Sequence, residues 1–290
     1  AVLETINTGL FTPHRARRLG WAHQTYAEFL AALCIHEHRM SSSQIDTLLL
    51  RDDGDGARVV PQLHETAVWL ASLNTEFANR LLTLEPELLL RSEVSRADPT
   101  TRMLLVSALL EQASENVLSP STYHDVPELA KLDHPGLAKQ LEPYLGRRLE
   151  HSNERELAVA IAGASSDETL ERWAVTVATD EDEPHVLRLA AASAIARYGA
   201  TDVKALLRPL LRVRQPGETL SDPDDQLRGF ALEALWPDQL TPDELFAALI
   251  RERRSNVVGV YQSFVYQLAR QTTKSMIVPG LKWIEREAPD

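Results

Sequence analysis

Apolar side chains recur three or four positions apart along most of this chain, the spacing that places them on one face of an α-helix. Pro61 suits a first helical turn because its missing N–H would have no partner there. Ala67 and Leu70 then continue the apolar face, and Asn74 and Asp98 stand where two further helices begin. The pattern predicts helices at about 42–51, 61–73, 74–84 and 98–110, with a polar loop at 114–128.

Three later stretches share one plan: a polar or acidic start, then an arginine, then an Ala-rich apolar stripe. They cover residues 153–161, 184–195 and 224–235. Aligning Arg155, Arg188 and Arg228 gives periods of 33 and 40 residues, the length of a helix pair in stacked arrays. The pattern resembles HEAT repeats. That resemblance implies an α-solenoid in which each arginine braces a neighbouring turn and has a structural role.

The first segment is the least repeat-like. Residues 8–12 and 19–23 are predicted to form two short strands around a basic turn from Pro13 to Arg18. A helix follows whose predicted apolar face contains Tyr26, Phe29, Leu30, Leu33 and Cys34. The expected fold is all-α, an α-solenoid of HEAT-like helix pairs with a short N-terminal β-hairpin. Three regions are expected: 1–38, an irregular helical array at 39–150, and repeats at 151–290.

Thirteen residues, Trp21-Ala-His-Gln-Thr-Tyr-Ala-Glu-Phe-Leu-Ala-Ala-Leu33, closely resemble a family signature. It is the sequence that ends the winged-helix module of NACHT-type STAND NTPases. The spans 61–71, 90–94 and 227–246 are similar to the C-terminal region of one bacterial subgroup of that family. The resemblance implies that 1–38 is the end of a winged-helix module. We therefore expect a part of a longer switch protein, in keeping with the start at Ala1 and the apolar rhythm still running at 283–290.

The resemblance also implies roles for single residues. In NACHT proteins the signature histidine contacts the phosphates of bound ADP, and the matching residue here is His23. This role needs the full-length protein. The competing interpretation is a packed, hydrogen-bonded core histidine. Tyr26 and Phe29 match the rest of the signature and are expected in the core, and Glu28 is expected to act as a brace.

Composition narrows the function further. The net charge of −12 argues against a general nucleic-acid binder, and against a HEAT-like DNA glycosylase, because both need a basic surface. The arginine clusters at 15–18 and 251–254 are read as solvated loop charges. One cysteine, Cys34, cannot form an internal disulfide and suits a reducing cytoplasm. No signal peptide and no membrane span are recognised.

Other chemistry is thinly represented. The chain has no Gly-x-x-x-x-Gly-Lys-Ser/Thr motif, so we expect no ATP hydrolysis by this chain, and ATP or ADP is implied only for the full-length protein. No catalytic residue and no metal site are predicted. His36 and His38 lack a third ligand, residues 52–56 lack EF-hand spacing and are read as an interhelical turn, and Cys34 is read as a buried, inert thiol.

Two functions remain. The first is the sensor and regulatory region of a bacterial NACHT-like STAND NTPase, active in signalling or anti-phage defence. Its repeats would bind a protein or other macromolecular trigger, with an upstream NACHT domain in cis and homo-oligomers on activation. The alternative is a free-standing α-solenoid scaffold that binds a protein or peptide.

Overall fold

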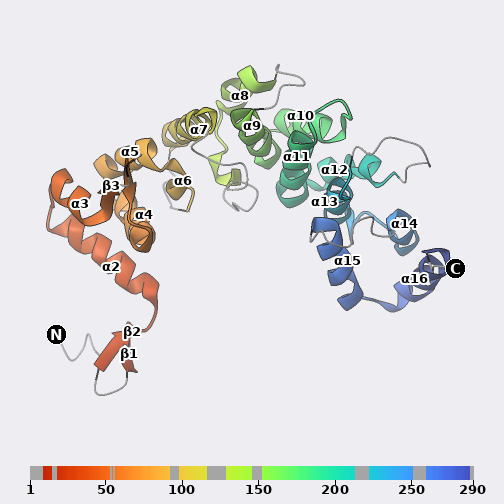
Figure 1. Ribbon diagram of the computed structural model, residues 1–290, viewed down its shortest axis with the longest axis horizontal. Coiled ribbons are helices and arrows are strands. Elements are labelled where there is room, and N and C mark those ends of the chain that lie inside the picture. The colour runs from red at the N-terminus through yellow and green to blue at the C-terminus, as the bar shows by residue number, and fades with distance from the viewer. Residues whose placement is uncertain are drawn as a thin grey trace. The chain divides into compact units, whose positions relative to one another are not determined.

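The computed structural model describes residues 9–14, 18–52, 54, 56–91, 98–115, 129–145, 152–212, 222–250 and 259–287. These residues are mostly helical, so the predicted all-α class is confirmed (Figure 1). The chain divides into two compact units, Ala1–Leu109 and Leu110–Asp290. The side chains of both arginine clusters and most of the predicted loop at 114–128 lie outside the described residues.

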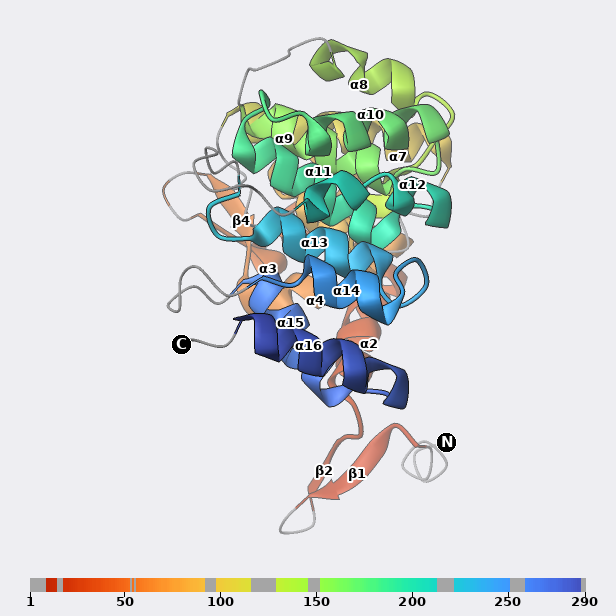
Figure 2. The same cartoon turned by 90° about the vertical axis from the view of Figure 1, so that its right-hand side faces the viewer.

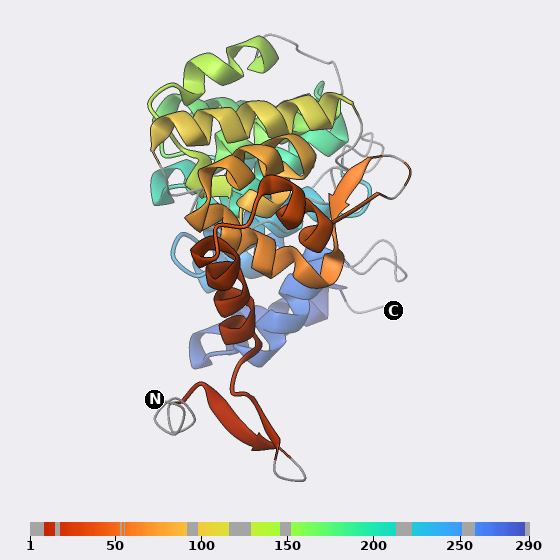
Figure 3. The ribbon, with the colours of Figure 1, turned by 90° about the vertical axis from the view of Figure 1, so that its left-hand side faces the viewer.

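Unit 1 begins with an antiparallel hairpin of β1 (Phe11–His14) and β2 (Arg18–Trp21), as predicted. Helix α2 (Gln24–Glu37) follows directly and packs on α4 (His64–Leu73) (Figure 3). The other elements are α3 (Ser42–Leu49), β3 (Leu50–Asp52), β4 (Ala57–Val59), the 3-10 turn η1 (Pro61–Leu63), α5 (Thr75–Leu84) and α6 (Pro86–Leu89). Helix α7 (Pro99–Ser114) spans the division between the units.

The segment around 50–59 differs from the prediction. Helix α3 ends at Leu49, and the residues after it pair as a second small hairpin, with Leu50 opposite Val59. The stretch 52–56, predicted as an interhelical turn, therefore lies between two paired strands, and positions 53 and 55 are outside the described residues. Gly54 and Gly56 have φ angles of +93° and +134°, which residues other than glycine rarely adopt. The buried Glu85 carboxylate accepts a hydrogen bond from Val59 N at 2.5 Å and fixes the hairpin.

Unit 2 consists of helices that pack in succession along the chain (Figure 2). Its elements are η4 (Leu129–Leu132), α8 (Leu137–Leu145), α9 (Asn153–Ala164), α10 (Glu168–Thr179), α11 (His185–Tyr198), α12 (Thr201–Ala205), η5 (Arg208–Leu211), α13 (Gln226–Leu235), α14 (Pro242–Ala248), α15 (Val260–Arg270), η6 (Lys274–Met276) and α16 (Ile277–Glu287). Helix α9 contacts α10 and α11, α11 contacts α13, α13 contacts α15, and α14 contacts α16.

Small residues set the spacing between these helices. Ala158, Ala162, Ala191 and Ala231 are fully buried where α9, α11 and α13 meet their neighbours. At Gly229 on α13 two helix backbones come close together: a Cβ there would lie 2.5 Å from Tyr261 N on α15. No side chain fits that space, so glycine permits the contact between the two backbones.

Candidate functional site

His23 lies at the junction between β2 and α2, in unit 1. Its backbone is extended, with φ −143° and ψ 140°, and it is the N-cap of α2. The imidazole Nδ1 accepts a hydrogen bond from Thr25 N at 3.3 Å and lies 2.9 Å from Thr25 Oγ1. The ring is exposed. A packed core histidine is therefore the wrong description of His23 in this chain.

Because the cap uses Nδ1 of His23, only Nε2 can bind a group outside this chain segment. Nδ1 accepts from a backbone N–H, so in the neutral ring the proton lies on Nε2. Nε2 makes no hydrogen bond within the described residues. An N–H at an exposed helix N-terminus is a suitable donor to an anionic oxygen, because the helix dipole favours negative charge there. The geometry leaves Nε2 free to bind an anionic group such as a phosphate.

The three other signature residues lie along the same helix. Phe29 is half-buried and packs edge to face on Trp69 of α4, with ring centroids 5.3 Å apart, in line with a core role. Tyr26 is 42% exposed and lies outside the core, contrary to expectation; its ring is 6.2 Å from that of His23. Glu28 is half-buried and has no ion pair among the described residues, so its role as a brace stays a prediction.

An exposed apolar surface adjoins His23. Trp21 stacks on its cross-strand partner Phe11 at 4.8 Å, yet it remains 42% exposed, and Leu19 on the same strand is 47% exposed. We call these two residues, together with the exposed His23 and Tyr26 that follow them along the chain, the hairpin surface: Leu19, Trp21, His23 and Tyr26. Exposed large apolar residues concentrated in one short stretch are candidates for contact with another surface.

Cys34 also differs from the prediction. Its thiol is exposed, and the residues of α2 that are buried are Ala32 and Ile35. Nδ1 of the His38 ring donates a hydrogen bond to Cys34 O at 2.8 Å, so this carbonyl near the helix end has a partner. Among the described residues no group of three potential ligands could hold a metal ion, His36 and His38 included.

The repeated arginines are structural, as predicted, and all three are buried in unit 2. Arg155 forms a two-pronged ion pair with Glu183, with both N–O distances 2.9 Å and exposures of 1% and 5%. This pair ties the start of α9 to the turn that precedes α11. Arg188 Nε donates to Ala178 O at the end of α10. Sequence reasoning missed Glu183, because it is one of four consecutive acidic residues, 180–183, and nothing in the sequence distinguishes it from the others.

Arg228 braces its neighbours through carbonyl groups instead of a carboxylate. Its guanidinium donates to Leu211 O at 2.9 Å, Ala248 O at 2.8 Å and Arg212 O at 2.9 Å. These carbonyls lie at the C-terminal ends of η5 and α14, where backbone oxygens have no helical partner and the dipole favours a cation. One side chain of α13 therefore fixes the ends of two other elements.

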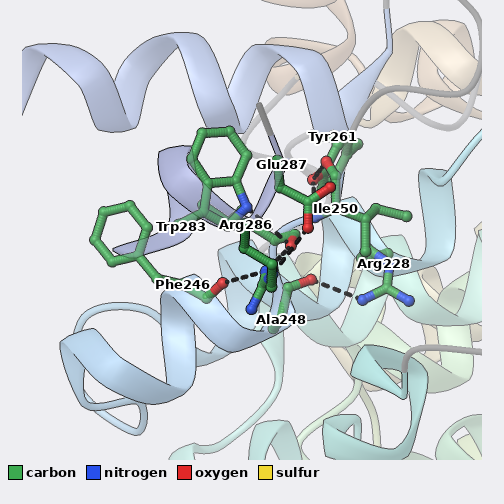
Figure 4. Close-up of polar contacts among 9 residues, drawn as sticks. Arg228, Phe246, Ala248, Ile250, Tyr261, Trp283, Arg286 and Glu287 are labelled. Atoms are coloured by element: carbon green, nitrogen blue, oxygen red, sulfur yellow. Dashed lines mark hydrogen bonds and ion pairs between the residues drawn. The ribbon is translucent and has the colours of Figure 1, made fainter. Parts of the chain in front are cut away.

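The end of α14 is held by further side chains (Figure 4). Tyr261 of α15 donates from its hydroxyl to Ile250 O at 2.6 Å and accepts from Ile250 N at 2.9 Å. Trp283 and Arg286 of α16 both donate to Leu249 O at 3.1 Å. Sequence analysis missed this cluster because its acceptors are backbone oxygens, which leave no trace in residue identity.

A cavity of about 160 Å³ lies beside these arginines, lined among others by Arg188, Arg228, Asp222 and Asp225. Burial alone would raise the pKa of Asp222, but hydrogen bonds from His185 and from two backbone N–H groups of α13 more than offset it and lower the pKa below its usual value. Charges of both signs line the cavity, and Arg228 is already hydrogen-bonded. The arrangement is a brace between successive helices.

Comparison with known proteins finds no match among protein-family models, curated proteins or solved structures. In the described part of the chain, no helix combines the length and apolar character needed to cross a membrane.

Proposed function

We propose that this chain is the sensor and regulatory region of a NACHT-like STAND NTPase. The observation that carries the proposal is His23 as an exposed N-cap between a β-hairpin and a helix, with Nδ1 used by the cap and Nε2 available. The signature resemblance assigns this residue to the phosphates of ADP. The exposed hairpin surface beside it is suited to contact an upstream NACHT domain in cis.

The helices of unit 2 would form a HEAT-like α-solenoid. The contacts from α9 through α11 and α13 to α15 support this, since each helix packs mainly on near neighbours in sequence. The three arginines support it as well, because each lies in the first turn of a helix and braces a neighbouring turn. A protein or other macromolecular trigger would bind the array, and its differential affinity for the open state would release the switch.

Nucleotide chemistry would belong to the longer protein. ADP would lock the resting state and ATP the active one, and active subunits would assemble into homo-oligomers in the cytoplasm. This chain supplies no phosphate-binding loop and would not hydrolyse ATP by itself. Its charge of −12 disfavours nucleic acid as the trigger.

The test uses the natural full-length polypeptide. It is purified and denatured, and any released nucleotide is identified by mass spectrometry, beside His23→Ser and His36→Ala forms. Serine keeps an N-cap acceptor while it removes the imidazole, and His36 is an exposed histidine of the same helix. We expect ADP in the wild type and in His36→Ala, and strongly reduced ADP in His23→Ser.

Other outcomes change the assignment. Equal ADP in all three forms would keep the NTPase and reduce His23 to a capping residue. No nucleotide in any form, with no P-loop upstream, would overturn the NTPase proposal. The alternative would then hold: a free-standing α-solenoid that binds a protein or peptide, an interpretation favoured by the extent of helix packing in unit 2.

A further inference from the structure

Helix α16 carries an exposed aliphatic stripe. Ile277, Val278, Leu281 and Ile284 are 50%, 60%, 61% and 56% exposed. Ile277, Leu281 and Ile284 are spaced by four and three residues, so they lie along one face of the helix, with Val278 beside them. We call these four residues the α16 stripe. No other helix in the described part of the chain exposes four large apolar side chains.

The opposite face of α16 packs on the rest of unit 2. Pro279 is buried, a Cβ at Gly280 would lie 3.1 Å from the Phe246 ring of α14, and the ring centroids of Trp283 and Phe246 are 6.4 Å apart. At 100° per residue, Leu281 and Trp283 point in roughly opposite directions. Helix α16 is thus apolar on two sides, as a helix between two packed neighbours would be.

We infer that the α16 stripe binds the α16 stripe of a second copy of this chain, in a two-fold symmetric contact. The area fits a weak dimer. Four aliphatic side chains at least half exposed present on the order of 400 Å², the size of the largest apolar patch on a typical monomer. Two copies would bury roughly 800 Å², which is below a permanent interface and within the range of reversible association.

Charge favours the same occupant. The chain carries a net charge of −12, so most of its surface would repel a second copy. Helix α16 is an exception, because Lys282 and Arg286 balance Glu285 and Glu287. Exposed Lys282 and Glu285 put both signs next to the stripe. A patch that is apolar, locally neutral and bordered by both signs can be complementary to itself, as a two-fold contact requires.

A two-fold axis across the helices near Leu281 would make them antiparallel and set Leu281 of each copy against the other's stripe. Leu281 is therefore the central residue of the contact. A charge at such a centre is desolvated on association, and central residues dominate the binding energy of an interface. This dimer would exist in the chain alone and does not depend on the proposed NTPase function.

The experiment is sedimentation velocity of the 290-residue chain from about 1 μM to about 200 μM, the range of a weak interface. We expect the weight-average mass to rise toward twice the chain mass of 32.4 kDa. Leu281→Glu should weaken dimerisation by roughly 30-fold or more. Leu48→Glu is the matched control, since Leu48 is a 49% exposed leucine on α3, and it should dimerise like wild type.

The far-UV circular dichroism of both variants should match wild type, because Leu48 and Leu281 are 49% and 61% exposed. An Ile277→Ala/Ile284→Ala form, which adds no charge, should weaken the dimer less than Leu281→Glu. A wild type that stays monomeric across the whole range would overturn the inference. A dimer that survives Leu281→Glu, or one that Leu48→Glu breaks equally, would place the contact elsewhere and also overturn it.

Discussion

The buried ion pair between Arg155 and Glu183 should be among the most sensitive points of unit 2. Both side chains are almost fully buried, and their two hydrogen bonds of 2.9 Å satisfy both carboxylate oxygens. Replacing only one partner leaves the other charge buried without its counter-ion. We predict that Arg155→Met alone, and Glu183→Leu alone, each lowers the free energy of unfolding by about 3–5 kcal/mol.

The double substitution should be much milder. Arg155→Met/Glu183→Leu removes both charges together and leaves apolar side chains of similar length, so no uncompensated charge remains. Replacement of a buried pair by apolar residues is often close to neutral. The sum of the two single effects should therefore exceed the double effect by at least about 3 kcal/mol, a coupling energy expected only for groups in direct contact.

Urea unfolding followed by circular dichroism supplies the four free energies of this cycle, with hydrogen exchange of α9 and α11 to show that unit 2 is the part that melts. Arg208 and Glu244 provide the matched control, since their ion pair has the same 2.9 Å distance but both side chains are nearly half exposed. The same cycle at the control pair should give only a small coupling, because water screens exposed charges.

The reasoning would be refuted if the single variants at Arg155 and Glu183 were no less stable than the control variants. It would also fail if the double variant were as unstable as the sum of the singles. Either result would mean that burial does not make the stability contributions of the two charges depend on each other.

Three further perturbations test other contacts of unit 2 by the same unfolding assay. Gly229→Ala should destabilise by about 1–3 kcal/mol, because the new methyl group would press on the backbone of Tyr261; an unchanged stability would contradict the close packing. Arg228→Met should cost about 3 kcal/mol, because it removes the N–H donors from two buried carbonyls and one partly buried carbonyl, and a cost below ~1 kcal/mol would mean that water replaces them. Because the pKa of Asp222 is lowered in the folded state, its ionised form stabilises the fold. This stabilisation is fully present above the unfolded pKa of ~4 and is lost as pH falls through the folded pKa. Wild-type stability should therefore fall more steeply with acid than that of Asp222→Asn, and parallel pH curves would rule this out.

Local sequence rules predicted the helices well because capping and periodicity are local. Asn74 caps α5 by accepting from Phe77 N, as its position before an apolar run suggested. The hairpin at β1 and β2 was predicted from its turn. The hairpin at β3 and β4 was missed, because its strands have only three residues each, too few to show an alternating pattern.

Which face of a helix is buried could not be predicted from one helix alone. The spacing of Tyr26 and Cys34 places them on a predicted apolar face of α2, yet the buried residues of this helix are Ala32 and Ile35. The side of α2 that faces the core is the side that packs on α4, where Phe29 contacts Trp69. The same limit applies to bonding partners. The position of Arg155 was evident from the repeat, but the carboxylate that meets it is 28 residues away in sequence, within an acidic run in which any member could have served.

The exposed residues around the start of α2 and the N-cap together determine how accessible His23 is. If Tyr26 and Trp21 packed on the core of unit 1, the histidine would be enclosed by its own chain and could serve only the fold. Both are 42% exposed instead, and the ring of Tyr26 lies edge-on to that of His23. An imidazole that caps with one nitrogen and stays exposed can also contact a second surface. The cap accounts for Nδ1 alone, so under the proposed function Nε2 would serve the partner that covers the hairpin surface.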